Sequence, residues 1–179
     1  MSIFLIGYRG TGKSTVAVHL AERLAWDWVD ADAVLETEAG ATIAEIFGQH
    51  GERGFRDWES AVVAKLAQQP KTVVALGGGA VLREQNRMAL RGRGPVVWLT
   101  ADPQTLWERI LADGATAARR PNLTPHGGVA EIEQLLQDRA PWYQAVADFA
   151  IDTVNKSPAA VAHEIYLRLN SSPSTGAPA

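Results

Sequence analysis

The segment Gly7-Tyr-Arg-Gly-Thr-Gly-Lys-Ser14 constrains the fold more than any other part of this sequence. It matches the pattern G-x-x-x-x-G-K-[ST] and stands between an apolar run, Ile3–Ile6, and a stretch with helical periodicity. Backbone N–H groups of such a loop turn inward around phosphate oxygens, and the N-terminus of the next helix adds positive potential. A glycine-rich turn ending in Lys-Ser by chance is the alternative, but the flanking strand and helix favour phosphate binding. We therefore expect a nucleotide-binding protein.

The residues of this loop are expected to play different parts. The ammonium group of Lys13 is predicted to reach the β and γ phosphates, and the hydroxyl of Ser14 to bind Mg²⁺. The glycines let the backbone approach the phosphates closely. The predicted nucleotide contacts from this segment are Gly10, Thr11, Gly12, Lys13, Ser14 and Thr15.

Apolar runs separated by helical patterns predict the rest of the fold. Val16, Leu20 and Leu24 recur every four residues, as on one face of a helix. Strands that alternate with helices favour a parallel, doubly wound sheet. We therefore predict an α/β fold of the P-loop NTPase type, with three layers (α/β/α) around a five-stranded parallel sheet. The expected strands are Ile3–Ile6, Trp28–Asp30, Thr72–Leu76, Val96–Leu99 and Phe149–Asp152.

Length and local irregularity predict the domain organisation. A chain of 179 residues can build one core but not two, so we expect a single domain over residues 1–170. Residues 112–128 hold prolines and glycines without a sustained period, and such a long irregular insert is usually functional, so we interpret it as a lid. The tail, 171–179, is rich in Ser, Pro, Gly and Ala and is expected to be disordered.

Composition argues against several classes of function. A net charge of −3 and a pI near 5.8 disfavour broad nucleic-acid binding, which needs many Lys and Arg side chains on one face. The absence of cysteine excludes disulfides, thiolate metal sites and cysteine nucleophiles, and it fits the cytoplasm. No apolar run approaches the length of a membrane span. We expect a cytoplasmic monomer that binds neither nucleic acid nor membrane.

Two aspartates end the second predicted strand. Asp30 and Asp32 are two positions apart, and the alternation of a strand would direct both carboxylates the same way. Phosphoryl transfer uses one carboxylate near Mg²⁺ and another that orients the acceptor hydroxyl and accepts its proton. A solvated turn with a helix cap is an equally good interpretation of the pair taken alone.

Further motifs accompany these aspartates along the chain. Together with Asp30-x-Asp32, they make the sequence resemble the shikimate kinase family from about Ile3 to the last predicted helix. The motifs are Gly51-Glu-x-x-Phe-Arg-x-x-Glu59, Gly77-Gly-Gly79 after the third strand, Arg120-Pro121 in the predicted lid, and Arg139-x-Pro-x-Tyr143.

The resemblance implies transfer of the γ-phosphate of ATP, with Mg²⁺, to the 3-hydroxyl of shikimate. It implies a substrate-binding segment at about residues 31–60 and three catalytic residues, Lys13, Asp32 and Arg120. Arg120 is also implied to contact the nucleotide, and the adjacent Arg119 leaves the choice between the two arginines open. Lys156 is a candidate contact near adenine, and Mg²⁺ is assigned to Ser14 and Asp30. The implied shikimate contacts are Asp32, Arg56, Gly77, Gly78, Gly79 and Arg139.

Other interpretations of these residues remain open. Arg56 taken alone is best explained as a helix-surface charge paired with Glu52 four residues earlier. A gluconokinase-like enzyme is the nearest alternative, because small-molecule P-loop kinases share a fold and the fold does not fix the substrate. A nucleotide-binding module without transfer activity is the alternative from another class, and it would lack acceptor-site residues.

Overall fold

The computed structural model describes residues 1–113 and 128–171. The strands are β1 (Ile3–Ile6), β2 (Asp27–Asp30), β3 (Thr72–Ala75), β4 (Val96–Thr100) and β5 (Phe149–Asp152). The helices are α1 (Lys13–Leu24), α2 (Ala31–Ala39), α3 (Ile43–Leu66), α4 (Glu84–Leu90), α5 (Pro103–Ala112), α7 (Gly128–Val146) and α8 (Pro158–Ser171), with a 3₁₀ turn, η1, at Ala80–Leu82.

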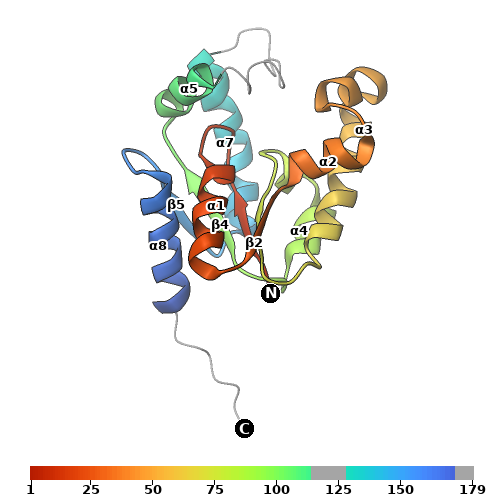
Figure 1. The fold of residues 1–179 in the computed structure, drawn as a ribbon. Coiled ribbons are helices and arrows are strands. Elements are labelled where there is room, and N and C mark those ends of the chain that lie inside the picture. Colours follow the sequence, from red (N-terminus) through yellow and green to blue (C-terminus); the bar gives the residue numbers. More distant parts are fainter. Residues whose placement is uncertain (114–127, 172–179) are drawn as a thin grey trace.

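The strands form one parallel sheet in the order β2-β3-β1-β4-β5, which confirms the predicted five-stranded parallel sheet. After the central strand β1, the chain forms β2 and β3 on one side of it. It later crosses to the other side, where it forms β4 and β5. Ligands of such sheets bind outside the carboxyl ends of the strands, where the connections diverge. The glycine-rich loop follows β1 and therefore lies at this point. Figure 1 shows α5 on one side of this end of the sheet and α2 with α3 on the other.

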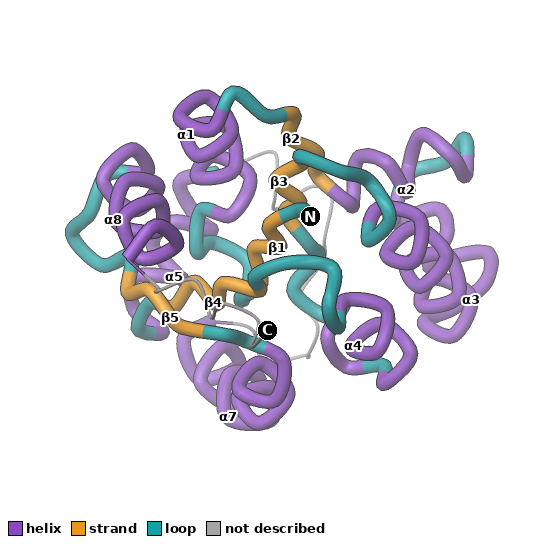
Figure 2. The backbone as a smooth tube through the Cα atoms, turned by 90° about the horizontal axis from the view of Figure 1, so that it is seen from below, coloured by secondary structure: helices purple, strands orange, loops and turns teal. Residues whose placement is uncertain are grey.

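Alternating side chains of β1 face two apolar clusters, one on each face of the same sheet. Ile3 and Leu5 pack among residues of α1 and α8, whereas Phe4 and Ile6 pack among residues of α2, α3 and α4. Figure 2 shows the corresponding helices on opposite faces of the sheet. Full burial of an aliphatic or aromatic side chain contributes about 1.5–3 kcal/mol. Successive side chains of β1 point to opposite faces of the sheet, and helices cover both faces. A wholly apolar strand therefore fits the middle of this three-layer fold.

Local signals determine how α3 begins and where it is interrupted. The side chain of Thr42 accepts a hydrogen bond from the backbone N–H of Glu45 at 3.2 Å, and the Glu45 carboxylate accepts one from the Thr42 N–H at 2.7 Å. The spacing Thr42-x-x-Glu45 is the sequence signature of such a reciprocal capping box, and the cap of a helix contributes about 1 kcal/mol. At Gly51 the backbone has φ 64° and ψ −174°, so the helical path breaks there and resumes with Glu52.

Two sequence predictions concern segments at the edge of the described part. The helix α8 extends through Ser171, so the first residue of the predicted tail is helical. The remainder of that tail, 172–179, and most of the predicted lid, 114–127, including Arg119 and Arg120, lie outside the described residues. Among the helices of residues 1–113 and 128–171, none combines the length and apolar character needed to cross a membrane.

Candidate active site

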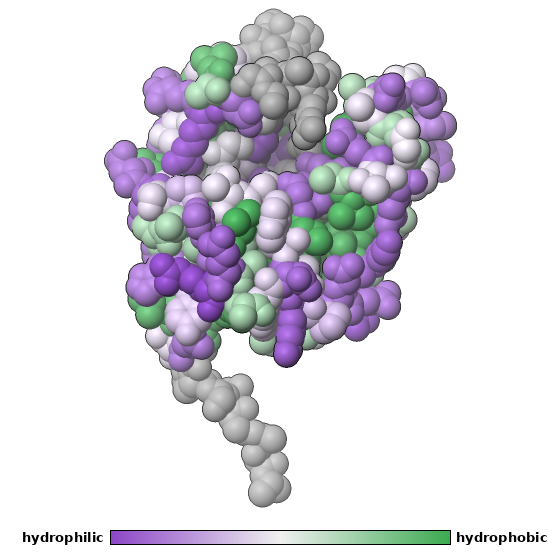
Figure 3. Space-filling model, in the orientation of Figure 1, coloured by the Kyte–Doolittle hydropathy of each residue, from purple (hydrophilic) through white to green (hydrophobic). Residues whose placement is uncertain are grey.

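The loops after β1, β2 and β3 enclose a cavity of about 570 Å³ at the carboxyl end of the sheet. Figure 3 shows this face of the molecule hollowed between the side that carries α5 and the side that carries α2 and α3. The cavity is lined by backbone and side chains from the glycine-rich loop, the start of α2 and the end of β3. Its lining includes Gly10, Gly12, Lys13, Ser14, Thr15, Asp30, Asp32, Gly77, Gly78 and Arg109.

Internal hydrogen bonds give the glycine-rich loop its shape. The Lys13 ammonium group donates to the backbone oxygens of Gly7 and Tyr8, at 2.8 and 2.9 Å. The buried Thr11 hydroxyl donates to the same Tyr8 oxygen at 2.8 Å. Because Lys13 folds back over the loop, its charge is held at the concave side that phosphates of a nucleotide would occupy.

Asp30 joins β2, α2 and the glycine-rich loop. Its Oδ1 accepts hydrogen bonds from the backbone N–H groups of Asp32 and Ala33, at 2.9 and 3.4 Å, and so caps α2. Its other oxygen, Oδ2, accepts a hydrogen bond from the Ser14 hydroxyl. The helix cap weighed at the sequence level is therefore present, and it leaves one carboxylate oxygen beside Ser14. A hydroxyl and a carboxylate side by side are the hard oxygen donors that suit Mg²⁺.

Asp32 lines the cavity, but from a helix and not from the end of a strand as the sequence predicts. The strand ends at Asp30, so Asp32 belongs to the first turn of α2, and the argument from strand alternation was wrong for it. Its carboxylate instead lies against the loop after β3. A Cβ at Gly77 would stand 2.8 Å from Asp32 Oδ1 and 3.2 Å from Glu59 Oε1, closer than packing allows. Glycine at position 77 is what lets both carboxylates approach this loop.

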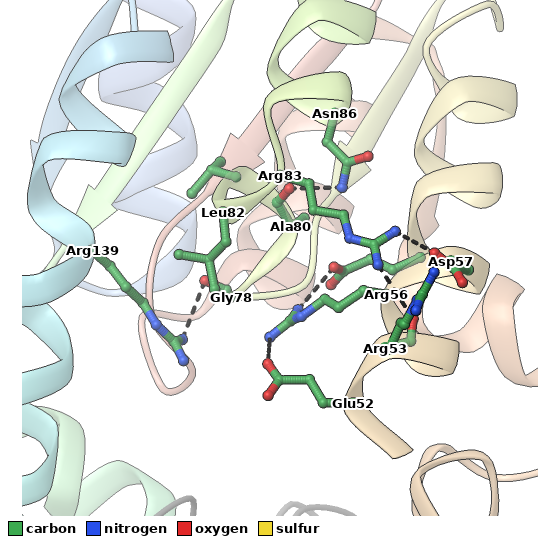
Figure 4. Close-up of polar contacts among 12 residues, drawn as sticks. Glu52, Arg53, Arg56, Asp57, Gly78, Ala80, Leu82, Arg83, Asn86 and Arg139 are labelled. Atoms are coloured by element: carbon green, nitrogen blue, oxygen red, sulfur yellow. Dashed lines mark hydrogen bonds and ion pairs between the residues drawn. The ribbon is translucent and has the colours of Figure 1, made fainter. Parts of the chain in front are cut away.

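Arg56 and Arg139 meet at the next two glycines. Arg56, from α3, donates through Nη1 to Glu59 at 2.8 Å and through Nη2 to Glu52 at 3.4 Å. Arg139, from α7, is buried and donates through Nη1 to the Gly78 oxygen at 3.4 Å. Figure 4 shows the two guanidinium groups approaching the Gly78 segment from opposite sides. Two arginines converging on one short loop form a site suited to a carboxylate.

Contact between Gly79 and Arg56 gives a test of this arrangement. A Cβ at Gly79 would stand 2.4 Å from Arg56 Nη1 and 2.6 Å from Nη2, so an added methyl group must displace the guanidinium. Because hydrogen bonds to charged groups are worth about 1.5–3 kcal/mol, Gly79→Ala should raise the KM for an acidic acceptor by about 10- to 100-fold. Steady-state kinetics should show an unchanged KM for ATP.

The matched control for that variant is Gly48→Ala. A Cβ at Gly48 meets no atom within 4 Å, and the residue lies in the same helix as Arg56. An acceptor KM that stays the same in both variants would mean that Arg56 is not held against Gly79 in the working enzyme.

Tyr143 is a site residue whose role the motif alone did not disclose. Its hydroxyl donates to the Gly78 oxygen at 2.5 Å, and its ring stacks on Trp98 of β4 with 5.4 Å between ring centroids. Burial raises the pKa of Tyr143 to about 12, although the neighbouring Arg139 acts to lower it, so the phenol remains a hydrogen-bond donor at neutral pH. Tyr143 and Arg139 together fix the Gly78 carbonyl.

Removing this hydroxyl is expected to loosen the loop. Tyr143→Phe should lower the free energy of unfolding by about 1 kcal/mol, the typical net worth of a hydrogen bond, and should raise the acceptor KM because Gly78 loses one of two donors. Denaturant unfolding and acceptor titration would measure the two effects. Tyr166→Phe, on α8, is the control. Equal stability losses in the two variants would contradict a specific role for the Tyr143 hydroxyl.

Arg109 is a second residue that sequence reasoning missed. From α5 it donates to the Gly10 oxygen at 3.3 Å, to the Thr153 hydroxyl at 2.9 Å and to the Thr153 oxygen at 2.9 Å. It thereby ties the glycine-rich loop to the segment after β5, and it also lines the cavity. Nothing in an amphipathic helix distinguishes one arginine as such a link. Lys156, the predicted adenine contact, pairs with Glu164 at 2.7 Å on the surface, and its role stays a prediction.

The five-stranded parallel sheet and the glycine-rich loop that follows its central strand β1 and lines the cavity define a P-loop kinase. The chain belongs to the shikimate kinase family, because residues 9–170 match the model of that family. This confirms the predicted resemblance. The class of reaction is phosphoryl transfer from ATP to an alcohol, with Mg²⁺ as the metal.

Individual relatives agree with this assignment. A shikimate kinase of Rhodopirellula baltica is 46% identical over 155 residues, which are 87% of this chain and 83% of that protein. One of Symbiobacterium thermophilum is 43% identical over 94% of this chain and 96% of that protein. The solved structure of shikimate kinase from Acinetobacter baumannii in complex with shikimate has a TM-score of 0.90 at 35% identity, covering 97% and 94% of the two chains.

A gluconokinase structure tests the nearest alternative. The enzyme from Sinorhizobium meliloti has a TM-score of 0.54 at 20% identity, which shows a shared fold and nothing about the acceptor. The comparisons therefore support the shikimate kinase interpretation over the gluconokinase-like one.

Proposed function

We propose that this chain transfers the γ-phosphate of ATP directly to the 3-hydroxyl of shikimate, giving shikimate 3-phosphate and ADP. The observation that carries the proposal is the convergence of Asp32, Arg56 and Arg139 on the loop Gly77–Gly79, next to the phosphate-binding loop. Membership of the shikimate kinase family supports the same reaction.

On the nucleotide side, the chain supplies a cation and a metal-binding pair. Lys13 is held over the loop by two carbonyl oxygens and would face the β and γ phosphates. Ser14 and Asp30 lie side by side and would hold Mg²⁺, and Asp30 would do so through a water molecule. When bound, Mg²⁺ neutralises charge on the phosphates during transfer. The loop would thus hold ATP, the phosphate donor, in place. No covalent enzyme intermediate is needed for the transfer.

On the acceptor side, each charged group has one task. Arg56 and Arg139 would grip the carboxylate of shikimate, because a guanidinium fork matches a carboxylate with two parallel hydrogen bonds. Glu59, with a side chain only 5% exposed, holds Arg56 in position. Asp32 would orient the hydroxyl and accept its proton as the new O–P bond forms and the bond from γ-phosphorus to the bridging oxygen of ADP breaks. Holding the acceptor hydroxyl in position for attack would favour direct transfer over hydrolysis of ATP.

Three further expectations belong to the same proposal. Arg120 would close over the transferring phosphoryl group as part of the lid, and residues 1–170 would fold as one domain. The enzyme would act as a monomer in the cytoplasm. Sedimentation at micromolar concentration with and without ATP should give the mass of one chain, and a larger species would contradict the monomer.

The test of the proposed function is ADP release from MgATP in one coupled assay with three conditions: shikimate, gluconate and no acceptor. Shikimate-dependent release is the expected result. ADP release with gluconate alone would mean that the protein is a kinase whose substrate is gluconate instead of shikimate. Equal release in all three conditions would make the protein an ATPase.

A further inference from the structure

Arg56 is shared by two glutamates that differ sharply in exposure. Glu59 contacts Arg56 Nη1 at 2.8 Å with a side chain 5% exposed, whereas Glu52 contacts Nη2 at 3.4 Å with a side chain 69% exposed. The side chain of Arg56 is 12% exposed, and its guanidinium lies against Gly79. The buried partner and the exposed partner therefore occupy the two terminal nitrogens of one arginine.

This arrangement conflicts with the binding of an anion to Arg56. A carboxylate gains most from a guanidinium when it accepts two parallel hydrogen bonds, and Glu52 already takes one of the two N–H groups of Nη2, so fewer donors of Arg56 are left for such a ligand. The negative charge of Glu52 also opposes the approach of an anion to the Arg56 guanidinium, while Arg139 at the same loop attracts one.

Only one of the two glutamates can leave at low cost. An exposed ion pair contributes about 0.2–1 kcal/mol, whereas separating a buried pair leaves an uncompensated charge inside the protein and costs far more. Glu52 also follows the break in α3 at Gly51, where φ is 64°, so it stands at the start of a new helical stretch. Figure 4 shows Glu52 and Arg56 approaching each other from separate turns of this segment.

We infer that Glu52 is an internal competitor for the substrate carboxylate: it holds Arg56 Nη2 in the free enzyme and is displaced when an acidic acceptor binds. The inference rests on the proposed function. Glu52 then sets how tightly acids bind, while Glu59 keeps the guanidinium in place throughout. The position is thus a determinant of acceptor affinity that neither touches the reacting atoms nor moves a proton.

The test is Glu52→Gln, which keeps the size of the side chain and removes its charge. The Kd and KM for shikimate should both fall about two- to fivefold, the factor that corresponds to an exposed ion pair. The KM for ATP should stay unchanged. The matched control is Glu22→Gln on α1, because Glu22 is 68% exposed and pairs with His19 at 3.5 Å.

A second ligand separates competition from a general change in the loop. The methyl ester of shikimate lacks the negative charge, so its Kd should be the same in Glu52→Gln and in the unmodified enzyme. An equal gain for the acid and the ester would overturn the inference. So would a weaker Kd for shikimate, since Glu52 would then position Arg56 instead of competing for it, and so would an unchanged Kd. Failure of the proposed function is seen separately, as absence of shikimate-dependent ADP release in the unmodified enzyme.

Discussion

Replacement of Asp32 by asparagine is expected to lower kcat by about 10²- to 10⁴-fold, the range that positioned general bases contribute. Asp32 lines the cavity together with the glycine-rich loop, and its carboxylate lies against Gly77. An amide of the same size can still contact the acceptor hydroxyl but cannot take its proton. The KM for ATP should change little, and stopped-flow or coupled ADP measurements at saturating shikimate would give the loss in kcat.

A second carboxylate of the same cavity provides the control for this variant. Glu36 lines the cavity, and its Oε1 accepts a hydrogen bond from the Ile43 N–H at 3.0 Å, a contact that a glutamine oxygen can keep. Glu36→Gln should therefore retain most of kcat. If it lost as much activity as Asp32→Asn, the cause would be the total charge of the cavity. If Asp32→Asn kept more than a tenth of kcat, proton transfer would not depend on Asp32.

The sequence predicts well the structural features that depend on residues close together in the chain. The run Ile3–Ile6, the glycine-rich loop and the helix behind it follow from local pattern, as does the capping box at Thr42. The strand ends shift by one residue where a turn begins: β2 begins at Asp27, and β3 ends at Ala75. Local steric and hydrogen-bonding rules decide these features, so a single sequence contains them.

The parts that the sequence leaves open depend on contacts between distant segments. Tyr143 of α7 reaches the oxygen of Gly78 in the loop after β3, and Arg109 of α5 reaches Thr153 after β5. The motif that contains Tyr143 does not give its partner, and no local pattern marks Arg109. Arg56 shows a further limit, because the pair with Glu52 that the sequence indicates is present, while the second pair, with the buried Glu59, comes only from the structure.

Loss of the Lys13 charge is expected to have an effect as large as loss of the Asp32 carboxylate. Lys13→Ala should lower kcat by about 10²–10³-fold or more, the cost of removing one fixed group that stabilises charge in the transition state. The two carbonyl oxygens that now hold the ammonium group belong to the loop itself. The KM for ATP should rise as well, because the same charge contacts phosphates in the ground state.

The control for Lys13→Ala is Lys65→Ala, which removes a lysine of the same size that pairs with Glu38 on the surface, its side chain 61% exposed. Its kcat and KM should match those of the unmodified enzyme. Thermal unfolding with ADP then separates binding from chemistry in the Lys13 variant. If ADP still stabilises the Lys13 variant against unfolding but the variant does not turn over, the Lys13 charge is needed in the transition state. A normal kcat at saturating ATP would contradict this prediction, because Lys13 would then only bind the nucleotide and would not stabilise the transition state.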